Sequence, residues 1–549
     1  MSDEIKHECA VAMVVMRKPP SATADLDGGT KLSLLLEKQH NRGQDGAGAA
    51  ILSEMPEPGT PPYWICKSAS STALADVLGD IAKREKPSGR KERIFLGHLR
   101  YATFGRGDTS FCHPFAHEAS ELPHTLLLAG NFNLTNTSEL FADYSSHGSF
   151  PTSKADGYLI CEMIAHELQS HSVAESVSKA LAAADGAWTF CGMTGDGWAF
   201  ATRDPHGIRP GFYFINDHVA VVASERPAIQ AAFDVPPEAV KELPPGKALI
   251  VSPEGDVMMS ELGSAIKGGS DGETAQRSCA FERIYFSRAN DADIHRERKA
   301  LGAALVPQIL AAADAPMEDI FFSYIPNSAR IAFHGLLERL FDEYGKIRFG
   351  EVAVKDAKFR TFIANAAARR EFYKHVYDVT YGLVRPGRDT LVVLDDSIVR
   401  GNTMKNAILP MLDRLGPKRI VIASSAPPIR YPDCYGIDMS TLGELVAFRA
   451  LVNLLGGNAD QELCNTPLPG LYARFADDRH CAEIARLLTP PGMNAEVKVV
   501  YQTIDALHES CPGSSGDWYF TGDYPTPGGF KVLQKALENY LGRRNERSY

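Results

Sequence analysis

The sequence lacks the features that mark membrane-spanning and secreted proteins. No apolar stretch approaches the roughly 20 residues that a helix needs to cross a bilayer. The N-terminal MSDEIKHE is polar and acidic, unlike the basic segment and apolar core of a secretory signal. The ten cysteines contain no CxxC pair, so we expect reduced and mostly buried thiols. These absences predict a cytoplasmic protein without a membrane partner.

The sequence also has fewer basic than acidic residues. Lys and Arg total 57 against 68 Asp and Glu, which gives a net charge of −11 at pH 7. This balance argues against a general nucleic-acid binder, although it does not exclude a local basic patch. Apolar content of 44% and charged content of 23% are typical of a soluble globular protein, and 549 residues predict several domains.

The stretch at 390–406, TLVVLDDSIVRGNTMKN, is the most informative functional motif in the sequence. Leu391 to Leu394 form a short apolar run, which suits a strand buried on both faces of a parallel sheet. Two adjacent acids and a small polar loop follow, and Thr403 stands where a helix can begin. Backbone N–H groups of such a loop and the helix N-terminus favour a phosphate.

The adjacent acids Asp395 and Asp396 add oxygen ligands at the end of this strand. They can accept ribose hydroxyls or hold a Mg²⁺-bound pyrophosphate. A bare acidic pair would more often belong to an ordinary turn between strand and helix. No Gly-Lys-Thr/Ser closes the loop, so it is not a Walker A motif.

The whole string resembles the phosphoribosyl-pyrophosphate (PRPP) signature of the type I phosphoribosyltransferases. The resemblance implies that the acids hold the ribose hydroxyls and Mg²⁺, and that the loop holds the 5′-phosphate. The PRPP-binding residues that it implies are Asp395, Asp396, Ser397, Val399, Arg400, Gly401, Asn402 and Thr403.

The N-terminal half centres on Cys9, which precedes the apolar run Ala10–Met16, a predicted buried strand. A lone cysteine there would more often be a core residue. Its distant companions change that interpretation: they are LEKQHNRGQDGAGAA at 36–50, GHLRYATFG at 97–105 and LAGNFNLTN at 128–136. Together, in this order, these segments resemble the class II glutamine amidotransferases, which are N-terminal-nucleophile (Ntn) hydrolases, over about the first 230 residues.

That resemblance implies a cysteine nucleophile. The thiol of Cys9 would attack the glutamine amide, release ammonia and leave a thioester. The side chain of Asn131 and the N–H of Phe132 would form the oxyanion hole. The glutamine-binding residues that the resemblance implies are Arg42, Arg100 and Asp156. Arg100 would pair with the α-carboxylate and Asp156 with the α-ammonium, while Arg42 lies in the segment that closes around the cysteine.

Two features bear on how this site works. An α-amino group titrates near 8 and can serve as the base when the cysteine is the first residue. Eight residues precede Cys9, so we expect cleavage after Glu8.

The family usually has glycine where this chain has Phe132, and Asn41 interrupts its usual QHRGQ run. Because phenylalanine disfavours positive φ, either the backbone angle at 132 is ordinary or the hole is altered.

The fold expected is an Ntn four-layer αββα sandwich followed by a doubly wound parallel-sheet phosphoribosyltransferase domain. The expected divisions are a propeptide at 1–8, the amidotransferase domain at 9–262, a linker at 263–278, the transferase domain at 279–455 and a C-terminal extension at 456–549. A basic stretch at 359–382 resembles the loop that folds over PRPP. Cys511 lacks a CxxC neighbour, so we expect no iron–sulfur cluster.

The two halves in this order resemble the amidophosphoribosyltransferase family. That family makes 5-phosphoribosylamine from PRPP and glutamine, the first step of de novo purine biosynthesis. The resemblance implies Mg²⁺, inhibition by purine nucleotides and a homo-oligomer. One alternative is the amidotransferase that makes glucosamine 6-phosphate, against which the string at 390–406 argues. The other is a PRPP-binding regulator, or an ammonia-only transferase, with a decayed glutaminase half.

Overall fold

Alternating apolar strands build two antiparallel sheets in the first half of the chain. The computed structural model describes residues 9–17, 27–54, 59–84, 92–102, 105–146, 148, 150–263, 276–355, 377–544 and 546–548. Across the first sheet the strands run β11 (Lys241–Glu242), β9 (Phe212–Ile215), β10 (Val219–Ala223), β1 (Ala10–Met16), β4 (Glu92–Arg100), β2 (Gly46–Ser53) and β3 (Tyr63–Ser68). Across the second they run β13 (Val257–Glu261), β12 (Lys247–Val251), β8 (Ala199–Arg203), β7 (Gly186–Thr194), β6 (Leu126–Leu134) and β5 (Phe115–His117).

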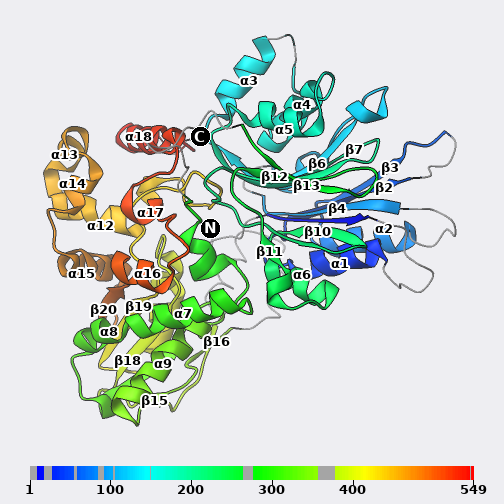
Figure 1. Ribbon diagram of the computed structural model, residues 1–549. Coiled ribbons are helices and arrows are strands. Elements are labelled where there is room, and N and C mark those ends of the chain that lie inside the picture. Colours follow the sequence, from blue (N-terminus) through cyan, green and yellow to red (C-terminus); the bar gives the residue numbers. More distant parts are fainter. Residues whose placement is uncertain are drawn as a thin grey trace.

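The two sheets face one another and helices cover their outer faces (Figure 1). Helices α1 (Gly28–Lys38), α2 (Ala73–Arg84) and α6 (Arg226–Phe233) pack on the first sheet. Helices α4 (Asp156–Glu167) and α5 (Val173–Leu181) pack on the second, with α3 (Thr137–Ser146) beside α4. This arrangement confirms the predicted αββα sandwich.

The second half builds a parallel sheet. Its strands run β15 (Arg348–Phe349), β14 (Ile320–Tyr324), β18 (Thr390–Asp395), β19 (Arg419–Ser424) and β20 (Glu496–Tyr501). One face is covered by α8 (Val306–Ala313) and α9 (Arg330–Tyr344), with α7 (Ala292–Ala304) packed on α9. The other is covered by the π-helical turn Met404–Ile408, α11 (Leu409–Asp413), α12 (Val446–Leu455) and α15 (Asp477–Leu488). Helices on both faces confirm the predicted doubly wound sheet.

Short elements complete the second half. They are β16 (Ala353–Lys355), β17 (Tyr377–Val379), α13 (Ala459–Asn465), α14 (Leu468–Tyr472), α16 (Ile504–Ser510), α17 (Trp518–Thr521) and α18 (Pro527–Leu541). Strand β20 lies beyond the expected domain end at 455, yet it pairs with β19 and closes the sheet. The transferase domain therefore extends past that boundary, because its edge strand comes from the segment interpreted as an extension.

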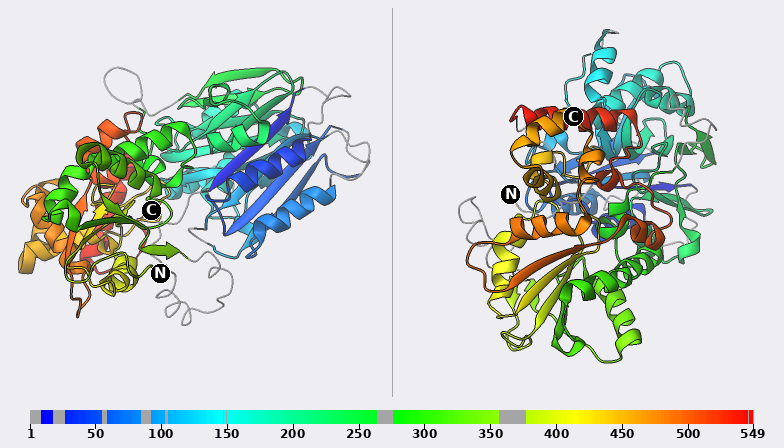
Figure 2. Two further views of the ribbon diagram at one scale, coloured as in Figure 1. Left: turned by 90° about the horizontal axis from the view of Figure 1, so that it is seen from below. Right: turned by 90° about the vertical axis from the view of Figure 1, so that its left-hand side faces the viewer.

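The C-terminal segments pack against both domains. Trp518 and Tyr519 join a buried cluster that also contains Ala187 and Ile208 of the first domain. The carboxylate of Asp185, just before β7, accepts hydrogen bonds from the hydroxyl of Thr526 and the N–H of Gly528. The left view of Figure 2 shows the two domains side by side, and Figure 1 labels α18 next to the C-terminus, near their junction. The first domain is thus capped by residues from the far end of the sequence.

A buried cluster of charges also joins the domains. The guanidinium of Arg42, which is 1% exposed, donates to Glu225 at 2.8 Å and to both oxygens of Glu282 at 3.1 and 2.6 Å. The hydroxyl of Ser287 donates to Glu282 at 2.6 Å. Although burial opposes the charge, the two carboxylates raise the pKa of Arg42 above its usual value. Glu282 belongs to the second domain, so this cluster ties it to the first.

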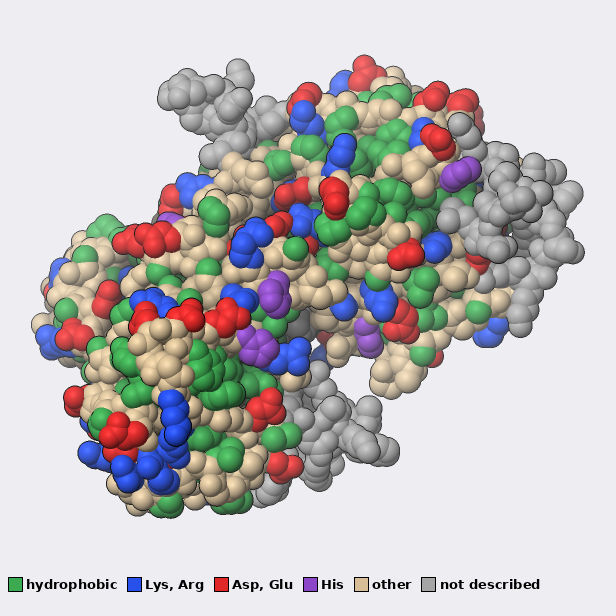
Figure 3. Space-filling view, turned by 60° about the horizontal axis from the view of Figure 1, so that its bottom comes forward, with side chains coloured by type: hydrophobic (Ala, Val, Ile, Leu, Met, Phe, Trp, Pro, Cys, Tyr) green, Lys and Arg blue, Asp and Glu red, His purple; other side chains and the backbone are tan. Residues whose placement is uncertain are grey.

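The surface carries both signs of charge. On the face shown in Figure 3, acidic and basic side chains are interspersed over both domains. None of the helices in the described residues combines the length and apolar character needed to span a bilayer.

The charge cluster generates a stability prediction. Arg42→Met leaves two buried carboxylates without their cation, which we expect to cost about 3–5 kcal/mol of unfolding free energy. Urea unfolding followed by tryptophan fluorescence measures the loss. Lys83→Met is the control, because it breaks only the exposed pair with Asp80 and should change little. Equal midpoints for the two variants would contradict the prediction.

Candidate functional site

The layer between the two antiparallel sheets is apolar along most of its length and polar at one end. Its apolar members include Val11, Met13, Leu96, Leu127 and Ala129. Side chains alternate along a strand, so the same faces of β4 and β6 next present His98, Arg100 and Asn131. The β1–β4 register pairs Ala10 with Leu99, which brings Cys9 to the same end, beside Arg100.

Cys9 is held as a thiol at this polar end. Its Sγ accepts a hydrogen bond from the N–H of Tyr101 at 3.3 Å. Burial raises the pKa of Cys9 to about 11, and the Tyr101 hydrogen bond and the charge of Arg100 only partly oppose the rise. The thiolate is the reactive form of cysteine, so this residue needs a base near it to act as a nucleophile.

The open edge of β6 presents a row of backbone N–H groups beside Cys9. Strand β5 pairs with β6 only as far as Leu128. Beyond it, the N–H of Gly130 donates to Nδ1 of His113 at 3.1 Å, and that of Leu134 donates to Asp156 at 3.3 Å. Phe132 lies between them, and the period of two turns its N–H to the same edge.

The backbone at Phe132 is ordinary extended strand. It pairs with Trp188 in the β6–β7 ladder and is not one of the non-glycine residues with positive φ. Its ring stacks on Phe190 at 4.9 Å, on the face away from Asn131. A glycine is therefore not required at 132 for its N–H to reach the edge.

Asp156 and Arg100 flank the same end. Asp156 is the first residue of α4, and its carboxylate accepts from the N–H groups of Leu134 and Gly157 at 3.3 and 2.8 Å. Burial raises its pKa, and a bound cation would lower it again. Arg100 donates to the carbonyl of Gly105 at 3.0 Å. This end of the sheet therefore carries a carboxylate and a guanidinium, whose charges are opposite to those of the α-ammonium and the α-carboxylate of an amino acid.

The structure gathers five of the six residues predicted for glutamine chemistry at this end: Cys9, Arg100, Asn131, Phe132 and Asp156. The side chain of the sixth, Arg42, points into the charge cluster with Glu225 and Glu282. Its contacts are those of a residue that joins the domains.

A second site lies at the carboxyl ends of β14 and β18. A cavity of about 680 Å³ opens there. Six of the eight predicted PRPP residues line it: Asp395, Asp396, Ser397, Val399, Gly401 and Thr403. Arg400 and Asn402 do not, since Arg400 turns away and donates to Glu444 at 2.7 Å.

The loop that follows β18 depends on Gly401. Its φ is +78°, a region that favours glycine. A Cβ at this position would lie 2.2 Å from Cδ2 of Leu488. Glycine therefore lets the loop turn back under α15 and present its backbone to the cavity.

The acidic pair lies beside hydroxyl groups, with Asp396 buried and Asp395 half-buried. Asp396 accepts from the hydroxyls of Ser328 and of Ser397, the latter at 2.8 Å. Asp395 accepts from the N–H of Asp396 at 2.9 Å. Carboxylate oxygens that line a cavity suit Mg²⁺, which usually takes one or two carboxylates and completes its shell from substrate and water. Within the described ranges no three metal-binding side chains gather.

Sequence reasoning missed Arg298 of α7, which lines this cavity. Its Nε donates to the carbonyl of Arg283 at 2.7 Å, and its Nη2 to that of Ser287 at 2.8 Å. Burial lowers its pKa to about 10, with the charge of Asp396 opposing the change, so it stays cationic at pH 7. It brings a fixed positive charge to the two acids.

The cavity is shared between domains. Asn41 and Gln44 of the first domain contribute to its wall. Asn41 donates to Glu225 at 3.3 Å and to the carbonyl of Phe286 at 3.5 Å. The segment that carries Arg42 thus reaches both sites. Residues 359–376 of the basic stretch at 359–382, the propeptide at 1–8 and most of the expected linker lie outside the described residues.

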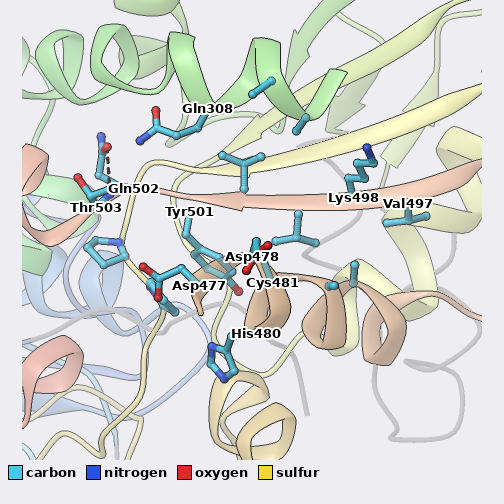
Figure 4. A pocket seen from close by; sticks show the side chains of 18 of the residues that line it. Gln308, Asp477, Asp478, His480, Cys481, Val497, Lys498, Tyr501, Gln502 and Thr503 are labelled. Carbon is cyan, nitrogen blue, oxygen red and sulfur yellow. Dashed lines mark hydrogen bonds between the residues drawn. The ribbon is translucent and has the colours of Figure 1, made fainter. Parts of the chain in front are cut away.

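Another cavity, of about 1310 Å³, lies along β20 between α8 and α15 (Figure 4). Gln308 reaches it from α8, Cys481 from α15 and Tyr501 from the strand. None of the predicted site residues lines it.

Comparisons with known proteins match both halves. Residues 114–231 match a family described as a glutamine amidotransferase domain. The amidophosphoribosyltransferase of Bacillus subtilis is 30% identical over 422 residues, covering 75% of this chain and 79% of that protein. The Staphylococcus epidermidis amidophosphoribosyltransferase is 26% identical over 523 residues, covering 94% and 91%. The structure of the B. subtilis glutamine PRPP amidotransferase, complexed with ADP and GMP, matches with a TM-score of 0.69 and 25% identity, covering 94% and 97%.

The environment of Cys9 predicts slow alkylation. Because its pKa is about 11, the thiolate fraction at pH 8 is small and should rise roughly tenfold per pH unit up to that value. Iodoacetamide labelling of the full chain at pH 7, 8, 9 and 10, read by peptide mass, measures the rate. The exposed Cys464 serves as an internal reference. A rate that levels off below pH 9 would contradict the burial argument.

Proposed function

The chain belongs to the amidophosphoribosyltransferase family, and from that premise we propose how its residues divide the reaction. It is a glutamine-dependent phosphoribosyltransferase of purine biosynthesis, which makes 5-phosphoribosylamine from PRPP and glutamine. The observation that carries the assignment of residues is the presence of two distinct sites in one chain. One is a thiol beside an open strand edge, and the other is an acid-lined cavity at the ends of parallel strands.

The first site releases ammonia. Sγ of Cys9 attacks the side-chain amide carbon of glutamine, and its proton passes to a base. The negative charge that develops on the amide oxygen is stabilised by the side chain of Asn131 and the N–H of Phe132. The C–N bond breaks, ammonia leaves with the transferred proton, and water hydrolyses the thioester to glutamate. The base is the α-amino group of Cys9, once residues 1–8 have been removed.

Two residues hold the substrate in this site. The guanidinium of Arg100 pairs with the α-carboxylate of glutamine, and Asp156 accepts its α-ammonium. The partners of Asp156 in the structure are backbone N–H groups, which leave the carboxylate acceptor capacity for a cation. Arg42 contributes by fixing the neighbouring segment through Glu225 and Glu282.

The second site holds PRPP. Asp395 and Asp396 accept the ribose hydroxyls, and the loop at 397–403 binds the 5′-phosphate through its backbone. Mg²⁺ bound at the acids would neutralise charge on the departing pyrophosphate. The buried guanidinium of Arg298 lies near Asp396 and adds positive charge beside the phosphates. Ammonia then attacks C1 of the ribose as pyrophosphate leaves.

Several wider properties follow as part of the same proposal. The related B. subtilis structure is complexed with ADP and GMP, which supports inhibition of this chain by purine nucleotides. A cytoplasmic location and a homo-oligomer complete the proposal, and they rest on the family resemblance.

One alternative has a specific observation in its favour. Phe132 stands where the family has glycine, so the chain could be an ammonia-only transferase or a PRPP-binding regulator. The extended backbone at 132 speaks for an intact donor and against this alternative.

The two-site assignment predicts a clean separation of activities. We expect Mg²⁺ and PRPP to stimulate glutamate release from glutamine. Cys9→Ser should abolish glutamine-dependent synthesis of phosphoribosylamine and keep the ammonia-dependent reaction. Asp396→Asn should lose about a hundredfold in both syntheses, since it removes a charge that orients PRPP. Coupled assays with either nitrogen source measure all three. A Cys9→Ser variant that still uses glutamine would overturn the assignment, and no glutamate from the unaltered chain would favour the alternative.

The proposed base predicts N-terminal processing. Active protein should begin at Cys9, and a chain that retains Met1 to Glu8 should release glutamate far more slowly, because a peptide nitrogen cannot accept the thiol proton. Intact-mass analysis of separated active and inactive fractions measures this. Full glutaminase activity in a fraction that keeps all eight residues would refute the α-amino base.

A further inference from the structure

Two buried histidines form hydrogen bonds with the backbone of Gly130, the residue before Asn131. His98 on β4 brings its Nε2 to 3.1 Å from the carbonyl oxygen of Gly130. His113, which precedes β5, accepts from the N–H of Gly130 through Nδ1 at 3.1 Å. The two rings stack with centroids 4.0 Å apart and planes 11° apart. One peptide position is therefore held through both its donor and its acceptor.

Hydrogen-bond roles fix the protonation of the pair. His113 accepts through Nδ1, so its proton is on Nε2, and His98 donates through Nε2 to a carbonyl. Nδ1 of His98 is buried, with no hydrogen-bond partner in the part of the chain that the structure describes. Burial lowers the pKa of both rings, that of His98 to about 3, so both are neutral at pH 7. A neutral pair places no competing charge beside the oxyanion.

Glycines fix where the loop of His113 can lie. A Cβ at Gly48 of β2 would lie 1.9 Å from the carbonyl oxygen of His113, so the loop rests directly on that strand. A Cβ at Gly130 would lie 2.1 Å from Cβ of Phe190, so β6 is pressed against β7 at this residue. Close packing at Gly48 and Gly130 therefore fixes the positions of the loop that carries His113 and of strand β6.

The location of these two hydrogen bonds along β6 indicates their role. Strand β5 stops pairing at Leu128, so beyond it no strand among the described residues determines the position of this edge of β6. His113 holds the edge at Gly130 and Asp156 holds it at Leu134, on either side of Phe132. The N–H of Phe132 and the side chain of Asn131 must point at one developing charge, and a displacement of about 1 Å can cost about a hundredfold in rate.

We propose that His113, backed by the stacked His98, is a positioning residue that holds the 130–132 segment of β6 for oxyanion stabilisation. The inference rests on the proposed glutaminase role of that segment. It concerns a residue that does not touch glutamine, so its effect should fall on the chemical step and not on substrate binding.

The test compares His113→Leu with His113→Asn in the full chain. Leucine removes the acceptor, while the amide oxygen of asparagine can replace Nδ1. We expect His113→Leu to lower kcat of glutamine-dependent synthesis about a hundredfold, with KM for glutamine changed less than about threefold. His113→Asn should recover at least about tenfold of that loss. Ammonia-dependent synthesis bypasses this half and provides the reference rate for each variant.

A control and a second readout keep the test decisive. His117→Leu makes the same change on β5, where the ring pairs with Glu162 and not with Gly130, and should keep nearly full glutaminase activity. Hydrogen exchange of the peptide spanning 130–132 should speed up in His113→Leu and not in His113→Asn, whether or not glutamine is hydrolysed. Two equally impaired variants, or unchanged exchange in His113→Leu, would overturn the inference. An unaltered chain that hydrolyses no glutamine would instead count against the proposed function.

Discussion

The buried contact between Arg42 and two glutamates is the interaction on which the arrangement of both sites depends. Burying a guanidinium is unfavourable unless carboxylates match its charge and geometry. Here one carboxylate, Glu225, comes from the first domain and the other, Glu282, from the second. Glu225 also accepts from the N–H of Arg288, which lines the second cavity. Neither domain can therefore shift without exposing or unpairing a buried charge.

The first site is built from an incomplete sheet. Most strand edges in the sandwich are paired, and backbone groups used in pairing are unavailable to a substrate. The short strand β5 leaves β6 open beyond Leu128, so side chains replace the missing strand. In the proposed mechanism a tetrahedral intermediate needs a fixed backbone donor, and an edge held on both sides of Phe132 would supply it.

The sequence predicted the buried strands because that signal is local, whereas the residues proposed for the sites came from the family resemblance. The runs at 10–16 and 391–394 are too apolar for any exposed element, and both lie in buried strands. Contacts between distant residues were not predictable in this way. Arg42 and Glu282 are 240 residues apart, and Arg298 lies in a charged helix where an arginine usually faces solvent. Strand β20 was not predicted from the sequence, because its apolar run is short and begins with alternating charges, as suits an edge strand.

Asp185 has a consequence for the order in which the molecule can be completed. Its carboxylate accepts from Thr135 of its own domain and also from Thr526, which follows it by 341 residues. At ribosomal rates of about 5–20 residues per second, roughly 20 to 70 s separate the emergence of the two. During that interval the hydrogen bonds from Thr526 and Gly528 to Asp185 are absent, although every residue of the first domain has been made. The junction between the two domains is therefore completed only near the end of translation, when the last segment of the chain reaches Asp185.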